Sequence, residues 1–595
     1  MSVVQQIKEA AAKAIHQLYD YPLEASAIAV NATKPEFEGD YAVVLFAFVK
    51  QFKKSPDELG NEIGTYLLQH NSDLVASFNI VKGFLNILVA NNFWLHFAQN
   101  AFNNPTYGMK ESNGNSVMVE YSSPNTNKPL HLGHLRNNFL GWSIAEILKA
   151  NGNDVYKTCI VNDRGVHICK SMIAWQRFAN GATPQSTNTK GDHFVGDYYV
   201  KFNDAYKVEV ETLIAQGFTK DAAEKEAPIM KATQQMLLDW EAGKPDVIEL
   251  WQTMNSWVYE GFGKTYQTIG SDFNKMYYES ETYLLGKGLV EKGLQQNVFY
   301  TKEDSSVWID LTGEGLDEKL VQRKDGTSVY ITQDIGLAEQ RYQEFNAAES
   351  IYVIGDEQNY HMKVLKLICQ KLQLPGANGI HHLSYGMVEL PTGRMKSREG
   401  TVVDADDLVQ AMLQIAQQKT EELGKVKDFT EAELNELYHT IGLGALKFFL
   451  LRVDPKKKMI FNPEESIDFH GFTGPFVQYT HARIKSILRK NESVSTATAF
   501  ELDDTTLMSL EKDVLVQLEL FPTIIAEAAA EHDPSKIAIY VFNVAQIFNS
   551  FYAQHSITNA ENEAKKQLRL QIATISAQVI KTGMKVLGIQ VPERM

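Results

Sequence analysis

Two histidines separated by a Leu-Gly pair precede a predicted helix in the stretch Asn127 to Gly141, NKPLHLGHLRNNFLG. His131 and His134 follow a proline and come before apolar residues at helical spacing, which indicates a helix N-terminus. Such a terminus favours anions, and a neutral imidazole can donate one N–H to a phosphate oxygen. Gly133 would let a ligand approach closely. Phosphate contact and an incidental surface position are both open, whereas metal binding is weaker because no carboxylate or cysteine set stands nearby.

A second candidate is the cationic stretch Gly393 to Val403, GRMKSREGTVV, which follows a predicted strand. A loop that carries Arg394, Lys396, Ser397 and Arg398 could stabilise phosphoryl charge in a transition state. Taken alone, the stretch fits an ordinary charged surface loop better.

A strand, a helix and a second strand are expected to position the two histidines. The strand SVMVEYSS ends at Pro124, and the apolar residues from Leu135 to Leu148 then recur near a 3.6-residue period. This helix is predicted to stop at Gly152, and DVYKTCIVND follows as a strand. Residues 116–163 therefore predict a parallel unit with a right-handed crossover. In open parallel sheets ligands bind outside the carboxyl ends of the strands, so the histidines stand where a phosphate would bind.

The rest of the chain predicts a multidomain α/β protein. Strand-like runs follow a charged helical stretch, and they are NVFYTKEDSSVWIDL, SVYITQDIG, SIYVIGDEQNYH and HHLSYGMVEL. After Gly400 the chain is almost wholly helical in pattern, without a convincing strand signal. The predicted domains are an N-terminal α+β domain at 1–110, a Rossmann-type parallel-sheet domain at 111–400 with a helical insertion at about 176–280, a helical connecting region at 401–470 and an all-α domain at 471–595.

The composition is that of a globular protein and excludes a largely disordered chain, because 44% of the 595 residues are hydrophobic and 22% are charged. Only three cysteines occur, without a CxxC pair, so neither a disulfide framework nor a cysteine zinc site is expected. The N-terminus lacks the apolar region of a signal peptide, and no run is long enough to span a bilayer. We therefore expect a cytoplasmic protein with no membrane partner.

The formal net charge of −16 argues weakly against a nucleic-acid partner, because phosphate binding needs a basic footprint. Such a footprint is local, however, and basic strips occur at Leu451 to Lys458 and at His481 to Lys490. Taken alone, both strips fit solvated charge runs better than an RNA site.

The two candidate motifs together resemble those of class I aminoacyl-tRNA synthetases. SSPNTNKPLHLGHLRNNFLG resembles the HIGH signature of that family, and RMKSREG resembles its KMSKS loop. The arginyl-tRNA synthetase family is the most similar over essentially the whole chain. KPEFEGDYA and KGFLNI resemble its N-terminal tRNA-binding domain, FTGPFVQYTHARIKSIL resembles the entry to its anticodon-binding domain, and VLGIQVPERM resembles its usual C-terminus.

This resemblance implies activation of arginine with ATP to arginyl-adenylate, in a tRNA-dependent step, and transfer to the 3′ end of tRNA-Arg by a monomer. His131 and His134 would hold the triphosphate in the transition state. The second lysine of the KMSKS signature aligns with Ser397, or with Lys396 if the register slips. The family then offers Lys128 as the compensating cation, with Arg398 and Lys396 in support.

The resemblance also places the nucleotide. Magnesium would travel with ATP, held mainly by phosphates and water, so no bound structural metal and no protein cage are expected. The implied ATP contacts are Pro129, Gly133, Gly355, Gln358, Ser397 and the backbone at Met387 and Val388.

The implied arginine pocket contains two acids, since a planar guanidinium with five donors is best bound by carboxylates. Glu120 and Asp334 match the family's guanidinium-binding acids, although a strand-edge charge and a helix N-cap are the simpler interpretations of each alone. Gln333 stands where the family would have an arginine. Tyr330 would close the site, and Ser123, Asn125 and Gln358 match further positions that hold the substrate.

For RNA, the helical domain after Gly471 would bind the anticodon stem-loop. Phe476, Tyr479 and His481 would offer stacking faces, and Arg483 and Lys485 phosphate contacts, although a packed helix face with snorkelling cations fits each residue equally well. Two alternative functions stay open, namely another class I adenylating enzyme and a non-catalytic tRNA-binding relative.

Overall fold

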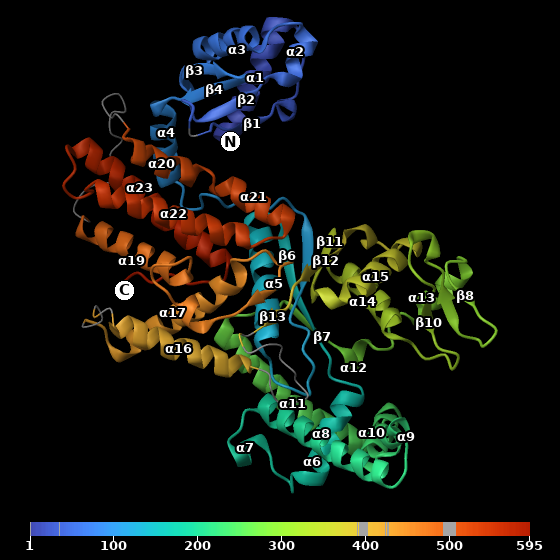
Figure 1. Ribbon diagram of the computed structural model, residues 1–595. Coiled ribbons are helices and arrows are strands. Elements are labelled where there is room, and N and C mark those ends of the chain that lie inside the picture. The colour runs from blue at the N-terminus through green and yellow to red at the C-terminus, as the bar shows by residue number, and fades with distance from the viewer. Residues whose placement is uncertain are drawn as a thin grey trace.

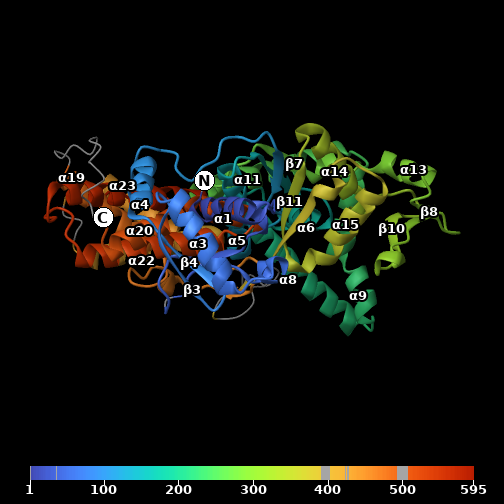
Figure 2. The same ribbon diagram turned by 90° about the horizontal axis from the view of Figure 1, so that it is seen from above.

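The structure is a computed structural model that describes residues 2–34, 36–389, 391, 403–422, 424, 428–491 and 507–595. Figure 1 shows a central body of sheet and helices, with an N-terminal domain at the top, one lobe at the right and another at the bottom. Seen from above, the molecule is elongated, with the C-terminal helices at one end and β8 (Tyr300–Thr301) and β10 (Lys319–Gln322) at the other (Figure 2).

The N-terminal domain is a four-stranded antiparallel sheet with helices packed beside it, in strand order β1-β2-β4-β3. A close packing of helix on sheet is visible at Gly64, where a Cβ would lie 2.5 Å from the Phe78 ring. The elements are α1 (Val3–Tyr19), β1 (Val30–Ala32), β2 (Tyr41–Val44), α2 (Phe46–Phe52), α3 (Pro56–His70), β3 (Val75–Val81), β4 (Phe84–Val89) and α4 (Asn91–Phe102).

The central body is built on a five-stranded parallel sheet in the order β12-β11-β5-β6-β7. The chain builds β5, β6 and β7 in one direction and returns to add β11 and β12 on the other side of β5, so the switch point lies between β5 and β11. The strands are β5 (Ser116–Glu120), β6 (Asp154–Val161), β7 (Lys275–Tyr278), β11 (Glu349–Gly355) and β12 (Ile380–Tyr385).

Helix α5 (Leu132–Ala150) connects β5 to β6 and is buried over most of its length. It approaches the strand residues closely, because a Cβ at Gly141 would lie 2.3 Å from Cβ of Tyr121. The Arg136 side chain of this helix is fully buried, and its guanidinium donates to the carbonyl oxygens of Gly386 at 2.8 Å and Lys457 at 2.9 Å. A helix so enclosed by protein is held in a fixed place relative to the sheet.

Helices fill the crossover between β6 and β7 and form the lower lobe in Figure 1. They are α6 (Val166–Phe178), α7 (Pro184–Thr187), α8 (Gly191–Ala215), α9 (Lys220–Glu226), α10 (Pro228–Glu241) and α11 (Pro245–Ile269). The second lobe contains a small antiparallel sheet in the order β10-β9-β8. Its further elements are α12 (Glu279–Thr282), α13 (Lys287–Gln295), β9 (Val307–Ile309), α14 (Tyr330–Phe345), the short 3-10 helix η3 (Asp356–Gln358) and α15 (Asn359–Lys371).

One of the strand predictions in this region is confirmed and one is wrong. The run NVFYTKEDSSVWIDL forms strands β8 and β9, which belong to the small sheet and not to the parallel sheet. The run SVYITQDIG forms the start of α14, although its β-branched residues are typical of a strand. The Thr332 hydroxyl accepts a bond from the Val329 backbone and donates to the Val321 carbonyl, which fixes the helix start.

The C-terminal half is largely helical and lies against α5 (Figure 1). The absence of a strand after Gly400 is also a wrong expectation, because two residues of β14 pair in parallel with β13, and so short a strand leaves no periodic signal. The elements are β13 (Val388–Glu389), α16 (Ala405–Glu422), α17 (Glu431–Leu451), β14 (Met459–Ile460), α18 (Pro463–Ser466), α19 (Gly474–Lys490), α20 (Ser509–Glu519), α21 (Phe521–Glu531), α22 (Ser535–Gln554) and α23 (Glu563–Val586).

The predicted fold class is confirmed, since a parallel-sheet domain with a helical crossover lies between an N-terminal α+β domain and C-terminal helices. Among the described helices, none has the length and apolar character needed to cross a membrane.

Candidate active site

His131 and His134 cap the helix that they begin. The Nδ1 atom of His131, the N-cap residue of α5, accepts a hydrogen bond of 3.1 Å from the backbone N–H of Gly133. In return, the His131 backbone N–H donates to Nδ1 of His134 at 3.2 Å. The two rings lie 4.0 Å apart between centroids. The prediction that both histidines stand at a helix N-terminus is confirmed.

These hydrogen bonds determine which ring nitrogens carry protons. An Nδ1 atom that accepts from a backbone N–H is unprotonated, so a neutral imidazole must carry its proton on Nε2. Burial, together with the charge of Lys128, lowers the pKa of His131 to about 3. Burial and the neighbouring His131 also lower the pKa of His134 well below its usual value. Both side chains therefore present one Nε2–H donor at neutral pH.

Gly133 is required by the histidine pair itself, and not only by a ligand. A Cβ at this position would lie 3.0 Å from Cε1 and 3.1 Å from Nδ1 of His131. A side chain here would therefore push against the capping ring. Packing of the His131 ring therefore explains why glycine stands at this position.

A cavity of about 160 Å³ adjoins the pair and is lined by Lys128, Pro129, His131, Asp197 and Asp404, among others. Helix α8 approaches Pro129 closely, since a Cβ at Gly196 would lie 2.8 Å from the proline Cδ. Lys128 lies near enough to the histidines for its charge to lower both pKa values. A cation and the neutral ring of His131 therefore line the same cavity, and His134 packs against that ring.

The chain just after the cationic stretch docks beside the histidines. The Leu132 N–H donates to the Val403 carbonyl at 3.2 Å, and the Ala405 N–H donates to the Leu130 carbonyl at 3.0 Å. Lys396, Ser397 and Arg398 themselves lie outside the described residues. The docking brings the end of their loop to the histidine pair, as the pairing of the two motifs requires.

An ion cluster holds this docked segment. The Lys190 ammonium lies 2.6 Å from Asp406 and 3.1 Å from Asp192, and His193 lies 3.1 Å from Asp406. The hydrogen bonds from His193 and Lys190 outweigh burial and lower the pKa of Asp406 to about 2. The hydrogen bond to Asp406 raises the pKa of His193. The first turn of α16 is therefore fixed to α8.

The residues predicted to contact the adenosine part of ATP lie at the switch point. Gly355 ends β11, next to β5, and Gln358 ends η3 and is exposed. Met387 is exposed and Val388 is buried, and both belong to the segment whose carbonyls Arg136 holds. Their backbone is thus anchored to the same helix that carries the histidines.

Glu120 is paired with a guanidinium of the protein itself. The carboxylate, at the carboxyl end of β5, is 4% exposed and accepts a short hydrogen bond from Arg341 on α14. The Arg341 guanidinium lies over the Tyr277 ring, 4.9 Å from its centroid. The simpler interpretation of Glu120 as a strand-edge charge is wrong, because the residue is buried and belongs to a central strand.

Asp334 is not a helix N-cap, so that interpretation is also wrong. The N-cap of α14 is Val329, and the Asp334 carboxylate lies in the next turn, 2.6 Å from Nε2 of His361. Tyr330, at the first position of the helix, is 73% exposed. The side chain of Asp334 is 39% exposed and is accessible to a ligand.

Sequence reasoning missed a further acid, Glu279, at the carboxyl end of β7. Burial raises its pKa to about 7, while Arg164 lowers it and Asp163 and Asp334 raise it. The charge of Asp334 is thus felt at Glu279, while His361 contacts Asp334 directly. Glu279 stands in no motif that the sequence analysis recognised, and His361 ends the run SIYVIGDEQNYH, in which only Gly355 and Gln358 were singled out.

Ser123 and Asn125 belong to the turn after β5, whose backbone is held in an unusual conformation. Ser123 has a φ of 45°, and its carbonyl accepts a hydrogen bond of 3.2 Å from the Asn162 side chain. Asn125 is exposed and forms a parallel bridge with Asn162. Both residues thus lie just beyond the carboxyl end of β5, beside the segment that follows β6.

The predicted RNA-contacting residues on α19 have partners within the helical domain. Phe476 packs on Phe542 with 5.0 Å between ring centroids. The Arg483 side chain donates to Asn549 at 2.6 Å and lies over the Tyr479 ring, and the Lys485 ammonium lies 3.1 Å from Glu593. The prediction of a stacking face for His481 is wrong, because this ring is 1% exposed and its Nδ1 bonds to the Pro592 carbonyl.

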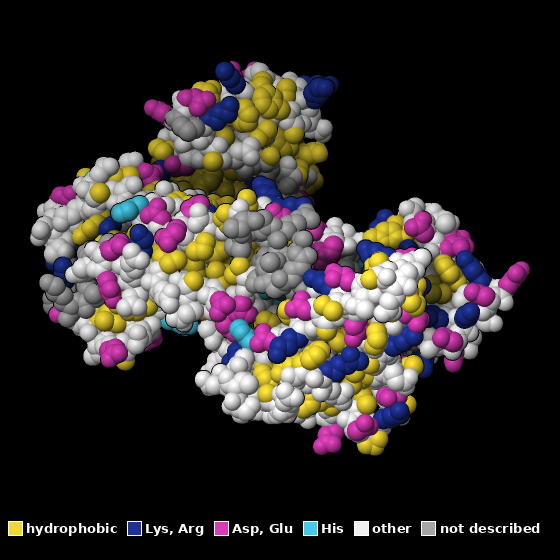
Figure 3. Space-filling model, turned by 60° about the horizontal axis from the view of Figure 1, so that its bottom comes forward, with side chains coloured by type: hydrophobic (Ala, Val, Ile, Leu, Met, Phe, Trp, Pro, Cys, Tyr) yellow, Lys and Arg dark blue, Asp and Glu magenta, His cyan; other side chains and the backbone are white. Residues whose placement is uncertain are grey.

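On the face drawn in Figure 3, the described Lys and Arg side chains are mixed with Asp and Glu side chains. The described residues provide neutral N–H donors and a cation at the start of α5, and carboxylates at the carboxyl ends of β5 and β7 and on α14. They can bind a ligand or ligand pair that carries both phosphate and a cationic group.

Comparisons with known proteins match the whole chain. Residues 5–89 match the arginyl tRNA synthetase N terminal domain, residues 97–462 the catalytic domain of tRNA synthetases class I (R), and residues 477–595 the DALR anticodon binding domain. Arginine–tRNA ligases of Flavobacterium psychrophilum and Parabacteroides distasonis are 52% and 50% identical, each with 100% of both chains covered. The solved arginyl-tRNA synthetase of Thermus thermophilus, 24% identical, has the same fold with a TM-score of 0.79 over 99% of each chain.

We expect the two capping histidines to stay neutral over the physiological pH range, with the proton on Nε2. In protein labelled with ¹⁵N-histidine, the ring shifts of His131 and His134 should therefore stay constant from about pH 5 to about pH 8. His193 is the internal control. Because its pKa is raised, its ring shifts should still be those of a protonated imidazole at about pH 6.5, the usual pKa of histidine. Titration of either capping ring near that value would contradict the assignment.

Proposed function

The chain belongs to the arginyl-tRNA synthetase family of class I aminoacyl-tRNA synthetases, and we propose that it ligates arginine to tRNA at the switch point of the parallel sheet. The predicted family and enzyme class are confirmed by the full-length relatives at about half identity. The single observation that carries the proposed site is the pair of imidazoles at the start of α5 whose Nδ1 atoms accept backbone N–H groups, which leaves each Nε2 as the proton donor.

In the first step, the arginine carboxylate attacks the α-phosphorus of ATP, arginyl-adenylate forms and pyrophosphate leaves. Negative charge builds on phosphoryl oxygens while the protein forms no covalent bond, so positioning and charge stabilisation supply the acceleration. His131 and His134 donate to these oxygens without charge of their own, and Lys128 supplies a cation. Lys396 and Arg398 support them from the loop whose end docks beside Leu132, with Ser397 contacting the nucleotide.

Magnesium arrives with ATP as part of the substrate, held by phosphate oxygens and water. Near the histidine pair, the described residues offer one cluster of potential ligands, Asp192, His193 and Asp406. The Lys190 ammonium already neutralises the two carboxylates, at 2.6 and 3.1 Å. This observation supports the expectation that the protein builds no cage for the metal.

The adenosine part of ATP binds between β5 and β11. Gly355 and the exposed Gln358 contact the ribose and base, and the backbone at Met387 and Val388 lies along the adenine. Pro129 and Gly133 border the phosphates. The proposed contacts follow the family pattern, and they are supported by the anchoring of the Gly386 and Met387 carbonyls to Arg136.

The guanidinium of the substrate is recognised by carboxylates at the carboxyl ends of β5 and β7 and on α14. Asp334 is exposed to a ligand and is held by His361, and Glu279, whose pKa burial raises to about 7, is a second acid under the influence of the Asp334 charge. Tyr330 closes the pocket, while Ser123, Asn125 and Gln358 hold the amino and carboxylate ends. Glu120 takes part when its bond to Arg341 rearranges, because the protein's own guanidinium occupies it in this structure.

In the second step the aminoacyl group passes to the terminal ribose of tRNA-Arg, and the chain acts as a monomer on one tRNA. We assign the binding and catalytic roles to three parts of the chain, namely an N-terminal domain at 1–110, the sheet domain, and the helical domain from 471 onward. Phe476, Tyr479, Arg483 and Lys485 contact the anticodon stem-loop after exchanging their internal partners for RNA. Because each residue must give up an internal partner, we expect its contribution to tRNA affinity to be modest.

Exchange of labelled pyrophosphate into ATP should require both arginine and tRNA. The physical reason is that Glu120 is engaged by Arg341 without RNA, so the arginine pocket is incomplete. Exchange is measured with each amino acid in turn, with and without tRNA. Robust arginine-dependent exchange in the absence of tRNA would contradict this requirement. If no exchange occurred under any condition, the result would favour the alternative of a non-catalytic tRNA-binding protein.

Replacing Asp334 by Asn should weaken arginine use by about 2–3 kcal/mol, the scale of a hydrogen bond to a charged group. Citrulline has the shape of arginine without its charge, and a site built for the cation rejects such an analogue by about 10⁴-fold. Discrimination, measured as the ratio of kcat/KM values with tRNA saturating, should narrow in the variant. Glu339→Gln, on the same helix, is the matched control and should leave the ratio unchanged. An unchanged ratio in Asp334→Asn would exclude Asp334 from guanidinium recognition.

A further inference from the structure

Glu349, His381 and His532 bring three potential metal ligands together at the amino ends of β11 and β12, opposite the end that holds the active site. We propose that these side chains bind a divalent transition-metal ion such as Zn²⁺ and thereby join the parallel sheet to the C-terminal helices. The proposal is independent of the aminoacylation chemistry. Within the described parts of the chain, the only other group of this kind is the one around Lys190.

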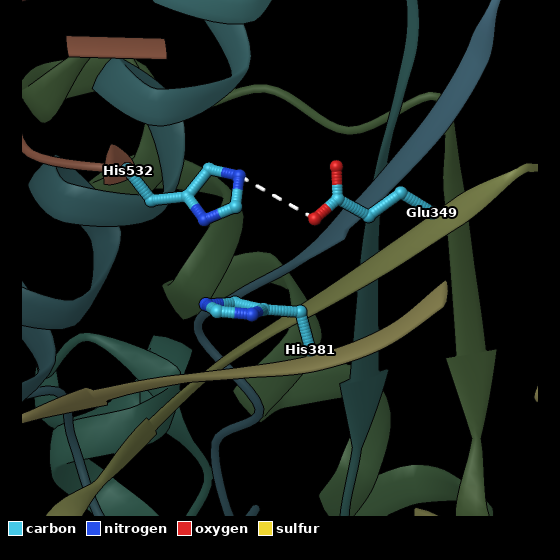
Figure 4. A group of neighbouring side chains, drawn as sticks. All are labelled: Glu349, His381 and His532. Carbon is cyan, nitrogen blue, oxygen red and sulfur yellow. Dashed lines mark ion pairs between the residues drawn. The ribbon is translucent and has the colours of Figure 1, made fainter. Parts of the chain in front are cut away.

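The three side chains converge on one point, as Figure 4 shows. Nε2 of His532 lies 3.5 Å from Oε1 of Glu349, and the rings of His381 and His532 lie 4.6 Å apart between centroids. One ligand atom from each residue lies within 4.8 Å of the others. Ligands at about 2.0–2.1 Å from a tetrahedral ion are about 3.4 Å apart, so small side-chain rotations suffice for binding.

The backbone places two of the ligands on one face of the sheet. Ile351 pairs with His381 across β11 and β12, and Glu349 precedes Ile351 by two residues. Side chains two residues apart in a strand point to the same face. Glu349 and His381 therefore project together without any contribution from loops.

The third ligand comes from the end of a C-terminal helix. His532 caps the C-terminus of α21 in the left-handed conformation, with a φ of 52°, which histidine adopts more readily than most residues. Its buried imidazole is directed at Glu349, as Figure 4 shows. The helix end therefore brings a ring nitrogen to the two ligands of the sheet.

The geometry is compatible with a shared metal ion. A separation of 3.5 Å between Nε2 of His532 and Oε1 of Glu349 is within the range of an ion pair but long for a hydrogen bond. An ion between the two side chains would use both atoms as ligands, together with a ring nitrogen of His381.

The ligand set selects the class of ion. Two imidazoles and one carboxylate suit Zn²⁺ and its neighbours rather than Mg²⁺ or Ca²⁺, which prefer oxygen ligands. Glu349 and His381 keep contact with solvent, so an ion can enter and a water molecule can complete the coordination. A bound ion would link the start of β11 and β12 to the end of α21.

The test is a titration of the full-length protein with Zn²⁺ by calorimetry and with Co²⁺ by visible absorption. We expect one equivalent of Zn²⁺ to bind and raise Tm, and Co²⁺ to give a d–d band of low-symmetry coordination. His532→Asn removes the imidazole but keeps a residue that tolerates the left-handed conformation. Its Zn²⁺ affinity should fall at least about tenfold, while its far-UV circular dichroism and metal-free Tm stay near wild type.

Two further variants complete the design. Glu349→Gln should also weaken Zn²⁺ binding, since it removes an anionic ligand with little change in size. His193→Asn, in the cluster that Lys190 fills, is the matched control and should bind Zn²⁺ as the wild type does. Absence of Zn²⁺ binding, or equal affinity in wild type and His532→Asn, would overturn the proposal, as would a loss of binding in His193→Asn alone.

Discussion

The hydrogen bonds between the first turn of α5 and its own two histidines are the interactions on which the active site depends. They satisfy two backbone N–H groups that a helix start leaves open, and they do so with ring nitrogens rather than with the usual hydroxyl or carboxylate. The same bonds leave Nε2 of each ring as a proton donor. Helix capping and phosphate recognition are thus one arrangement, and an acidic cap would have repelled the nucleotide.

The buried helix α5 connects the two histidines to the rest of the molecule. Arg136 ties the helix to carbonyls on both sides of the β13–β14 pair, and the Ser143 hydroxyl donates to the Val586 carbonyl at the end of α23 at 2.9 Å. The C-terminal helices therefore contact the same element that carries His131 and His134. A shift of these helices on RNA binding would reach the site through a rigid, enclosed helix rather than through a flexible linker.

The sequence was sufficient to predict features whose signals are local. The strand, helix and strand around the histidines have clear periodicity, and the residues before and after α5 mark its ends. Contacts between distant residues could not be predicted in this way, such as Arg341 with Glu120 and His361 with Asp334. The start of α14 was missed because its β-branched residues are typical of strands, and tertiary contacts outweigh that preference.

The most direct test of the account is the replacement of His131 by Asn. Asn is a good N-cap residue, so its side-chain oxygen can still accept from the Gly133 N–H, and stability should stay near wild type. It lacks the Nε2–H donor, so kcat for aminoacylation should fall about 100- to 1,000-fold, equivalent to about 2.7–4 kcal/mol of transition-state stabilisation. A stable variant with this loss supports the dual role of the ring, whereas a stable variant with wild-type kcat would contradict it.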